Sequence, residues 1–143
     1  MSNTRMEILT HCEAIQQAKG TVLVAGLGLG MFLTSICDKP EVGQIIVVEK
    51  STDVMNLVAP TFSSHPKISI INADIFEWKP EKDMKFDFVW FDIWDEICSD
   101  NLKEMTKLKR KYNKWGKIKL CWGEQECRKY LRENKCYGWN YAI

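Results

Sequence analysis

The sequence lacks the features that mark several large classes of protein. No apolar run approaches the roughly 18 residues of a membrane span. The N-terminal segment also lacks the apolar block and the small-residue cleavage site of a signal peptide. The six cysteines form no CxxC pair. The sequence therefore predicts reduced thiols and a cytoplasmic location.

Patterns typical of metal sites, repeats and linkers are missing as well. A set such as Cys121, Cys127, Cys136 and His11 fits no zinc-ligand spacing, and we therefore expect no metal ion. The chain has 143 residues, of which 45% are hydrophobic and 27% charged. This composition is ordinary for a globular protein, and we expect one domain spanning residues 1–143.

The formal net charge of +1 hides an uneven distribution along the chain. Residues 1–100 hold eight Lys and Arg against fifteen Asp and Glu, whereas residues 101–143 hold twelve against four. The two parts therefore carry formal charges of −7 and +8. Such asymmetry indicates either an anionic partner or a solvated, lysine-rich helix face.

Apolar residues alternate along the chain between continuous runs and helical spacing. The continuous runs predict strands at 21–27, 44–50, 67–76, 86–94 and 116–122. The helical spacing predicts helices at 4–18, 29–39, 51–62, 100–115 and 124–134. Solid apolar strands that alternate with helices predict an α/β fold. We expect a Rossmann-like, doubly wound parallel sheet of about five strands, with helices on both faces.

The fifth predicted strand differs from the other four. Lys117 and Lys119 alternate with Ile118 and Leu120, which is typical of a half-exposed edge strand. An unpaired edge favours self-association, which would give a homodimer. The aromatic residues that follow could cover this edge or cross to a partner: Tyr137, Trp139 and Tyr141.

The stretch VLVAGLGLGMF, residues 22–32, places three glycines directly after the first predicted strand. Gly26, Gly28 and Gly30 indicate a backbone that bends sharply or lets a ligand come close. Ligands of doubly wound folds bind at the carboxyl ends of the strands. The first helix turn beyond the glycines presents free amides to such a ligand. Glycines at this place also serve simply to pack a helix close to a strand.

Glu49 ends the second predicted strand, 23 residues after Gly26. A carboxylate at about this distance can accept hydrogen bonds from both hydroxyls of a ribose. Together, the turn and the acid predict a cofactor that carries a nucleoside. Glycine turns that bind NAD usually read GxGxxG or GxGxxA, but the last position here is the bulky Met31.

The spacing GxGxG, with the segments that follow it, resembles class I S-adenosylmethionine-dependent methyltransferases. The resemblance covers about residues 20–122, through the stretches VLVAGLGLG, VVEK, NADIFEW and FDFVWFDIW. It implies that the glycines wrap the methionine part of S-adenosylmethionine. It also implies that Glu49, beside Lys50, holds the ribose and that Asp74 contacts the adenine amine. Ile75 and Leu27 suit the faces of the purine.

The sequence departs from the common pattern at Val24, where many of these enzymes carry an acid that helps to bind the methionyl amine. Spermidine synthases, which share the fold, also tend to have an apolar residue there. Their DxxD arrangement matches Asp92 to Asp95, although Leu29 stands where their glycine motif usually has Asp. An aminopropyl transferase therefore stays open as an alternative to a methyltransferase.

Acidic residues follow the fourth predicted strand, where the methyl group would lie. Asp92 and Asp95 are the candidate catalytic residues, as bases or as groups that orient an amine. Asp92 is also a candidate cofactor contact, and Trp94 could stack on a flat or cationic substrate. For the two histidines, His11 and His65, we expect no partner that would form a catalytic pair.

The methyl acceptor is the part of the function that the sequence specifies least. We expect a small-molecule substrate. Nucleic acid is the alternative, because the region Lys107–Lys119 interleaves seven basic residues with Tyr112 and Trp115. Residues 136–143 leave room for at most one short strand, so we expect a minimal version of the family fold, similar to small bacteriophage proteins. A cofactor- or partner-binding module without transfer activity is the second alternative.

Overall fold

A computed structural model describes the backbone of residues 5–138 and the side chains of residues 11–134. Five strands form one parallel sheet in the order β3-β2-β1-β4-β5. Their bounds are Gly20–Ala25 (β1), Val42–Glu49 (β2), Ile68–Asn72 (β3), Phe86–Phe91 (β4) and Gly116–Cys121 (β5). The order runs outward from β1 in both directions. The structure therefore confirms the predicted doubly wound α/β fold.

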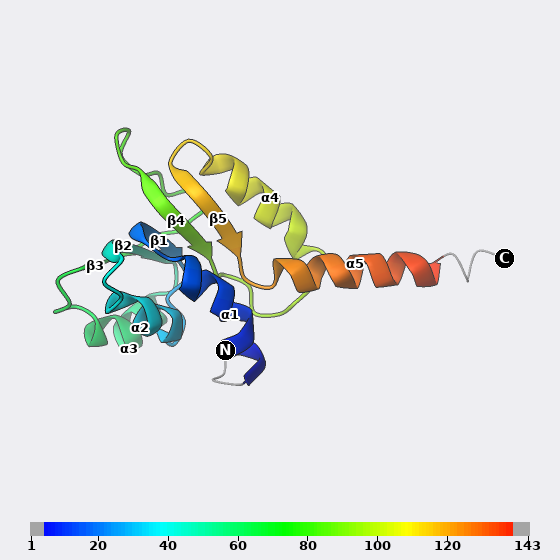
Figure 1. The fold of residues 1–143 in the computed structure, drawn as a ribbon, viewed down its shortest axis with the longest axis horizontal. Coiled ribbons are helices and arrows are strands. Elements are labelled where there is room, and N and C mark those ends of the chain that lie inside the picture. The colour runs from blue at the N-terminus through cyan, green and yellow to red at the C-terminus, as the bar shows by residue number, and fades with distance from the viewer. Residues whose placement is uncertain (1–4, 139–143) are drawn as a thin grey trace.

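Helices connect the strands and cover both faces of the sheet (Figure 1). Residues of α1, α2 and α3 pack on one face, and residues of α4 pack on the other. The last helix, α5, extends away from the sheet beyond β5 (Figure 1). The helix bounds are Arg5–Gln17 (α1), Met31–Cys37 (α2), Thr52–Val58 (α3), Asn101–Lys111 (α4) and Glu124–Gly138 (α5), with a 3₁₀ turn, η1, at Ala59–Thr61.

Alternation along the strands divides the core into two layers. Val22 and Val24 of β1 point into the layer beneath α1 and α2, whereas Leu23 and Ala25 point into the layer beneath α4. All four side chains are buried. Because both faces of the central strands are covered, their sequence reads as a solid apolar run.

Several predicted elements have other bounds than the observed ones. The strands predicted to reach residues 76 and 94 end at Asn72 and Phe91, and the helix predicted to reach residue 115 ends at Lys111. The helix predicted over 51–62 ends at Val58 and continues as the 3₁₀ turn that contains Pro60, because proline donates no amide hydrogen to a helix. The final helix reaches Gly138 instead of ending at residue 134. Residues 136–138 are thus helical and do not form a strand. Trp139 and Tyr141 lie outside the described residues.

The prediction that β5 is an edge strand is confirmed by the strand order. A homodimer through this edge stays a prediction. Among the helices of residues 5–138, none has both the length and the apolar character needed to cross a membrane.

Cys121, at the end of β5, is a buried free thiol, and burial raises its pKa to about 12. The nucleophilic thiolate is therefore scarce at neutral pH. Cys98, in the loop before α4, is half-buried. We expect iodoacetamide at pH 8 to modify Cys98 well before Cys121, with peptide mass spectrometry as the readout. In denaturant the two residues should react alike, and fast labelling of Cys121 in the native protein would contradict its burial.

Candidate functional site

A cavity of about 400 Å³ lies at the carboxyl ends of β1, β2, β3 and β4. Parallel strands present their carboxyl ends at one edge of a sheet, so loops that are distant in sequence meet there. Eight of the ten predicted site residues line this cavity: Gly26, Gly28, Glu49, Lys50, Asp74, Ile75, Asp92 and Asp95. The fold thus brings residues from separate loops to one cavity.

Gly26 begins the glycine turn, and its surroundings explain why no larger residue fits. Its φ is +96°, and a Cβ built there would lie 2.0 Å from the backbone oxygen of Asp92. The amide of Gly26 donates to Val48 O at 2.9 Å, and Asp92 N donates to Ala25 O at 2.8 Å. The turn is therefore held against β2 and β4 by backbone contacts, which leave bare backbone facing the cavity.

Leu27 and Gly30 do not line the cavity. The Leu27 side chain is buried in the core on the α1–α2 face of the sheet. Gly30 precedes α2 with a φ of +80°, and a Cβ there would lie 2.6 Å from the Phe62 ring. In this structure Gly30 allows a close approach between α2 and the segment after η1, and Leu27 presents only its backbone to the turn.

Glu49 has a structural task besides any contact with a ligand. Its carboxylate is almost fully buried, Oε2 accepts from Leu27 N at 2.6 Å, and Oε1 accepts from Ser51 N at 2.9 Å. The side chain thus ties the glycine turn to the end of β2. A carboxylate has roughly four lone-pair sites, so capacity remains for hydroxyl donors from a ligand.

Asp74 begins the turn after β3. Its Oδ1 accepts from Phe76 N at 2.9 Å, and its Oδ2 lies 3.4 Å from Lys50 Nζ. The hydrogen bond from Phe76, followed by the interaction with Lys50, lowers the pKa of Asp74 below its usual value. The carboxylate is therefore kept ionised, in a form that can accept a hydrogen bond from a ligand amine.

Two side chains at the C-terminal end of α4 hold the loop 75–78 by hydrogen bonds. Lys111 Nζ donates to Ile75 O, Phe76 O and Trp78 O at 3.0, 2.6 and 2.7 Å. The Tyr112 hydroxyl lies 2.8 Å from Ile75 O and 2.9 Å from Trp78 O. Lys111 and Tyr112 therefore fix the conformation of the loop that carries Ile75 into the lining of the cavity.

Acidic side chains line the cavity beyond β4. Asp92, Asp95 and Glu104 all contribute to this wall, and Trp94 Nε1 donates to Glu104 Oε2 at 2.8 Å. The Trp94 ring is therefore held by a bond to α4. This part of the cavity suits a ligand that carries hydrogen-bond donors or a positive charge.

His11 is the residue that sequence reasoning missed. Its Nε2 lies 3.0 Å from Asp92 Oδ2, and both side chains are at least nine-tenths buried, at 4% and 10% exposure. The expectation that His11 has no such partner was wrong, because the pairing spans 81 positions of the sequence. The available signal was its spacing from Ile8 and Ile15, which puts His11 on the buried face of the helix.

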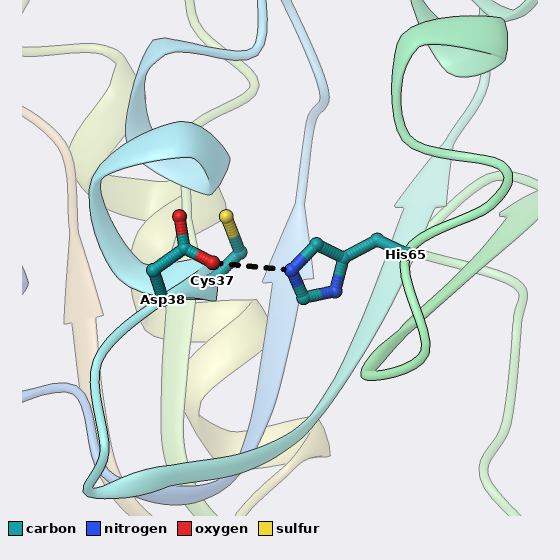
Figure 2. A group of neighbouring side chains, drawn as sticks. All are labelled: Cys37, Asp38 and His65. Atoms are coloured by element: carbon teal, nitrogen blue, oxygen red, sulfur yellow. Dashed lines mark hydrogen bonds and ion pairs between the residues drawn. The ribbon is translucent and has the colours of Figure 1, made fainter.

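His65 also has a partner, in a second cluster on a different part of the molecule (Figure 2). Its Nε2 lies 3.4 Å from Asp38 Oδ1, and Cys37 Sγ lies nearby. The His65 Nδ1 accepts from Lys67 N at 3.3 Å. Burial raises the pKa of the Cys37 thiol. This shift disfavours the thiolate form of Cys37 that a metal ion would bind.

The basic segment 107–119 is largely engaged within the protein. Tyr112 and Trp115 are buried, so neither can stack on a base in this structure. Lys111 binds the three carbonyls described above, and Lys109 pairs with Glu124 Oε2 at 2.5 Å. The Lys114 ammonium lies 4.3 Å from the centroid of the Trp115 ring. The aromatic part of the expected nucleic-acid footprint is therefore absent from the surface.

No protein-family model matches the chain, and no curated protein matches it in sequence. Solved structures do share its fold. The 23S rRNA methyltransferase ErmE is 22% identical, with a TM-score of 0.52, over 71% of this chain and 40% of ErmE. DhpI in complex with SAH is 15% identical, with a TM-score of 0.57, over 80% of this chain and 55% of DhpI.

The N-methyltransferase NodS from Bradyrhizobium japonicum WM9 is 14% identical, with a TM-score of 0.61, over 82% of this chain and 66% of NodS. The chain thus spans 40% to 66% of the length of these three proteins. Their similarity shows that the chain has the Rossmann-like fold of class I S-adenosylmethionine-dependent methyltransferases, as the motif resemblance implied.

Proposed function

We propose that the chain binds S-adenosylmethionine in the cavity at the carboxyl ends of the strands and transfers its methyl group to a small molecule. One observation carries this proposal. The glycine turn, the buried Glu49 and the Asp74–Ile75 pair line a single cavity, although they come from separate loops. The complex of DhpI with SAH, on the same fold, supports the choice of cofactor.

The chemistry of the lining fits the parts of this cofactor. Glu49 has acceptor capacity for ribose hydroxyls, and Asp74 can accept from the adenine amine. Ile75 supplies apolar surface to the purine. The bare backbone at Gly26 and Gly28 leaves room for the remaining part of the molecule. When bound, S-adenosylmethionine supplies a methyl group activated by a positively charged sulfur.

The residues after β4 would serve the acceptor. Methyl transfer requires that the nucleophile be held in line and, for some acceptors, that a proton be removed. Asp95 lines the cavity and is available as a base or as a group that orients the acceptor, with Asp92 beside it at the end of β4. Acidic side chains in this wall favour an acceptor with hydrogen-bond donors, such as an amine.

A nucleic-acid acceptor is less well supported. ErmE is by its description a 23S rRNA methyltransferase, and the basic segment 107–119 motivates the same idea for this chain. However, Lys109 and Lys111 are engaged in internal interactions, and Tyr112 is fully buried. A small molecule that enters the acidic end of the cavity agrees better with these contacts.

Calorimetry with S-adenosylhomocysteine tests the cofactor. We expect wild type to bind it and Glu49→Gln to bind it more weakly by about 2–3 kcal/mol, because the charged acceptor for the ribose is lost. Glu41→Gln is the matched control, since Glu41 is exposed and outside the cavity. Thermal unfolding of each variant separates ligand affinity from the support that Glu49 gives to the turn.

The outcomes separate the candidate functions. Absence of binding by wild type would remove the cofactor claim, and equal affinity of wild type and Glu49→Gln would remove Glu49 from the site. Binding without release of a labelled methyl group to any amine or hydroxyl acceptor would indicate the binding module. Transfer of an aminopropyl group from decarboxylated S-adenosylmethionine would indicate the aminopropyl transferase.

A further inference from the structure

The His11–Asp92 pair lies directly beneath the cavity. The His11 ring packs against two aromatic side chains that also stack on each other, with centroid distances of 6.1 Å to Phe32 and 5.5 Å to Trp90. It cannot turn freely, so its Nε2 stays directed at Asp92 Oδ2, 3.0 Å away. One oxygen of the Asp92 carboxylate is thereby fixed from inside the protein.

The second oxygen of this carboxylate, Oδ1, is left free to accept a further hydrogen bond. Within the part of the chain that the structure describes, the Asp92 side chain makes no hydrogen bond other than the one with His11. The side chain is only 10% exposed, yet Asp92 lines the cavity. Among the described residues, the fully buried polar side-chain atoms without a hydrogen-bond partner are Trp90 Nε1 and Trp115 Nε1. Oδ1 is not one of them, so it is open to a donor from the cavity. The arrangement therefore suits a ligand whose own donor completes it.

The position of Asp92 within the cavity indicates which part of the ligand it meets. In the strand order β3-β2-β1-β4-β5, Asp74 follows β3 and Asp92 follows β4, with the glycine turn of β1 between them. A ligand with its adenosine at Asp74 and Glu49 therefore extends over Gly26 toward Asp92. The buried Val24 of β1 supplies no carboxylate on the way.

We propose that His11 is a positioning residue that presents Asp92 Oδ1 to the α-ammonium group of the cofactor's amino-acid part. This inference rests on the proposed function. An ammonium carries three donors and a positive charge, and it would satisfy both the unpaired oxygen and the charge of the carboxylate. Asp95 is then the carboxylate left for the methyl acceptor.

Three ligands separate this contact from the rest of the site. S-adenosylhomocysteine carries the ammonium, its deamino analogue lacks only that group, and 5′-methylthioadenosine lacks the whole amino-acid part. We expect wild type to bind S-adenosylhomocysteine about 10- to 100-fold more tightly than the deamino analogue, the range of a charge-assisted hydrogen bond. In Asp92→Asn the two ligands should bind with nearly equal affinity, while the affinity for 5′-methylthioadenosine stays within about twofold.

Variants at His11 test its positioning role. His11→Leu should reduce the preference for the ammonium, and His11→Gln, whose amide can still donate to Asp92, should restore most of it. Asp95→Asn is the matched control, because Asp95 lines the same cavity and should leave the preference unchanged. A purely structural role of His11 would lower the affinities for all three ligands together. Thermal unfolding confirms that each variant is folded.

The wild-type measurements keep the inference testable even where a variant does not fold. If wild type binds S-adenosylhomocysteine and its deamino analogue equally, the proposed contact with the ammonium is wrong while the cofactor site stands. The proposed contact is equally wrong if Asp92→Asn keeps the wild-type preference. If wild type binds none of the three ligands, the proposed function itself is wrong.

Discussion

Gly26→Ala is expected to destabilise the protein by about 2–5 kcal/mol, through backbone strain and steric overlap together. The residue has a φ of +96°, which disfavours any side chain, and the new Cβ would lie 2.0 Å from Asp92 O and 2.9 Å from Asp92 C. These atoms belong to the backbone at the end of β4 and cannot move aside as a flexible side chain would. Chemical unfolding followed by circular dichroism measures the loss.

Gly43→Ala is the control for this substitution. Gly43 is exposed in β2, has no positive φ, and a Cβ there would meet nothing closer than Gly20 O at 3.8 Å. Its unfolding free energy should change by no more than about 0.5 kcal/mol. Similar stabilities for the two variants would contradict the close approach of the turn to β4. Where Gly26→Ala still folds, its displaced turn should also weaken binding of S-adenosylhomocysteine.

Lys111→Met is expected to cost about 2–4 kcal/mol of unfolding free energy, because hydrogen bonds to a charged donor are lost and buried acceptors are left unsatisfied. Lys111 Nζ donates to Ile75 O, Phe76 O and Trp78 O. Burial removes the Lys111 ammonium group from water and lowers its pKa. The cation therefore depends on these three carbonyls for its hydrogen bonds. Urea unfolding measures the effect.

Lys103→Met, on an exposed position of the same helix, should change the stability by about 0.5 kcal/mol or less. Tyr112→Phe removes the other donor to this loop, and its effect should not add to that of Lys111→Met, since both serve Ile75 O and Trp78 O. Additive effects would contradict a shared anchor. A loosened loop should also lower the affinity for adenosine-containing ligands, because Ile75 lines the cavity.

The same contacts bear on the charge asymmetry of the sequence. The excess of lysine in residues 101–143 suggests an anionic partner when it is read as composition alone. In the folded chain, Lys111 holds the loop after β3 and Lys109 pairs with Glu124. A cluster of cations in a sequence therefore overstates the charge that is free to meet a ligand, because long basic side chains also bind carbonyls and acids within the protein.

The sequence by itself determined the fold class and the edge of the sheet where the candidate site residues meet. Strands covered on both faces must be continuous apolar runs, and β1, β2 and β4 carry this pattern locally. The sequence also predicts that the glycine turn and the acids that follow strands lie close together, because parallel strands bring their carboxyl ends to one edge of the sheet. Less was readable at the C-terminal end of the described chain, where α5 continues to Gly138 through residues without a clear periodic pattern.

Only the tertiary structure decided what each polar residue does. It pairs His11 with Asp92 across 81 positions, and it occupies two acceptor sites of Glu49 with the amides of Leu27 and Ser51. It also turns Lys111 inward, away from the solvent expected for a lysine-rich helix face. The physical reason is that periodicity reports which face of an element is buried, whereas a hydrogen-bond partner depends on which elements the topology brings together.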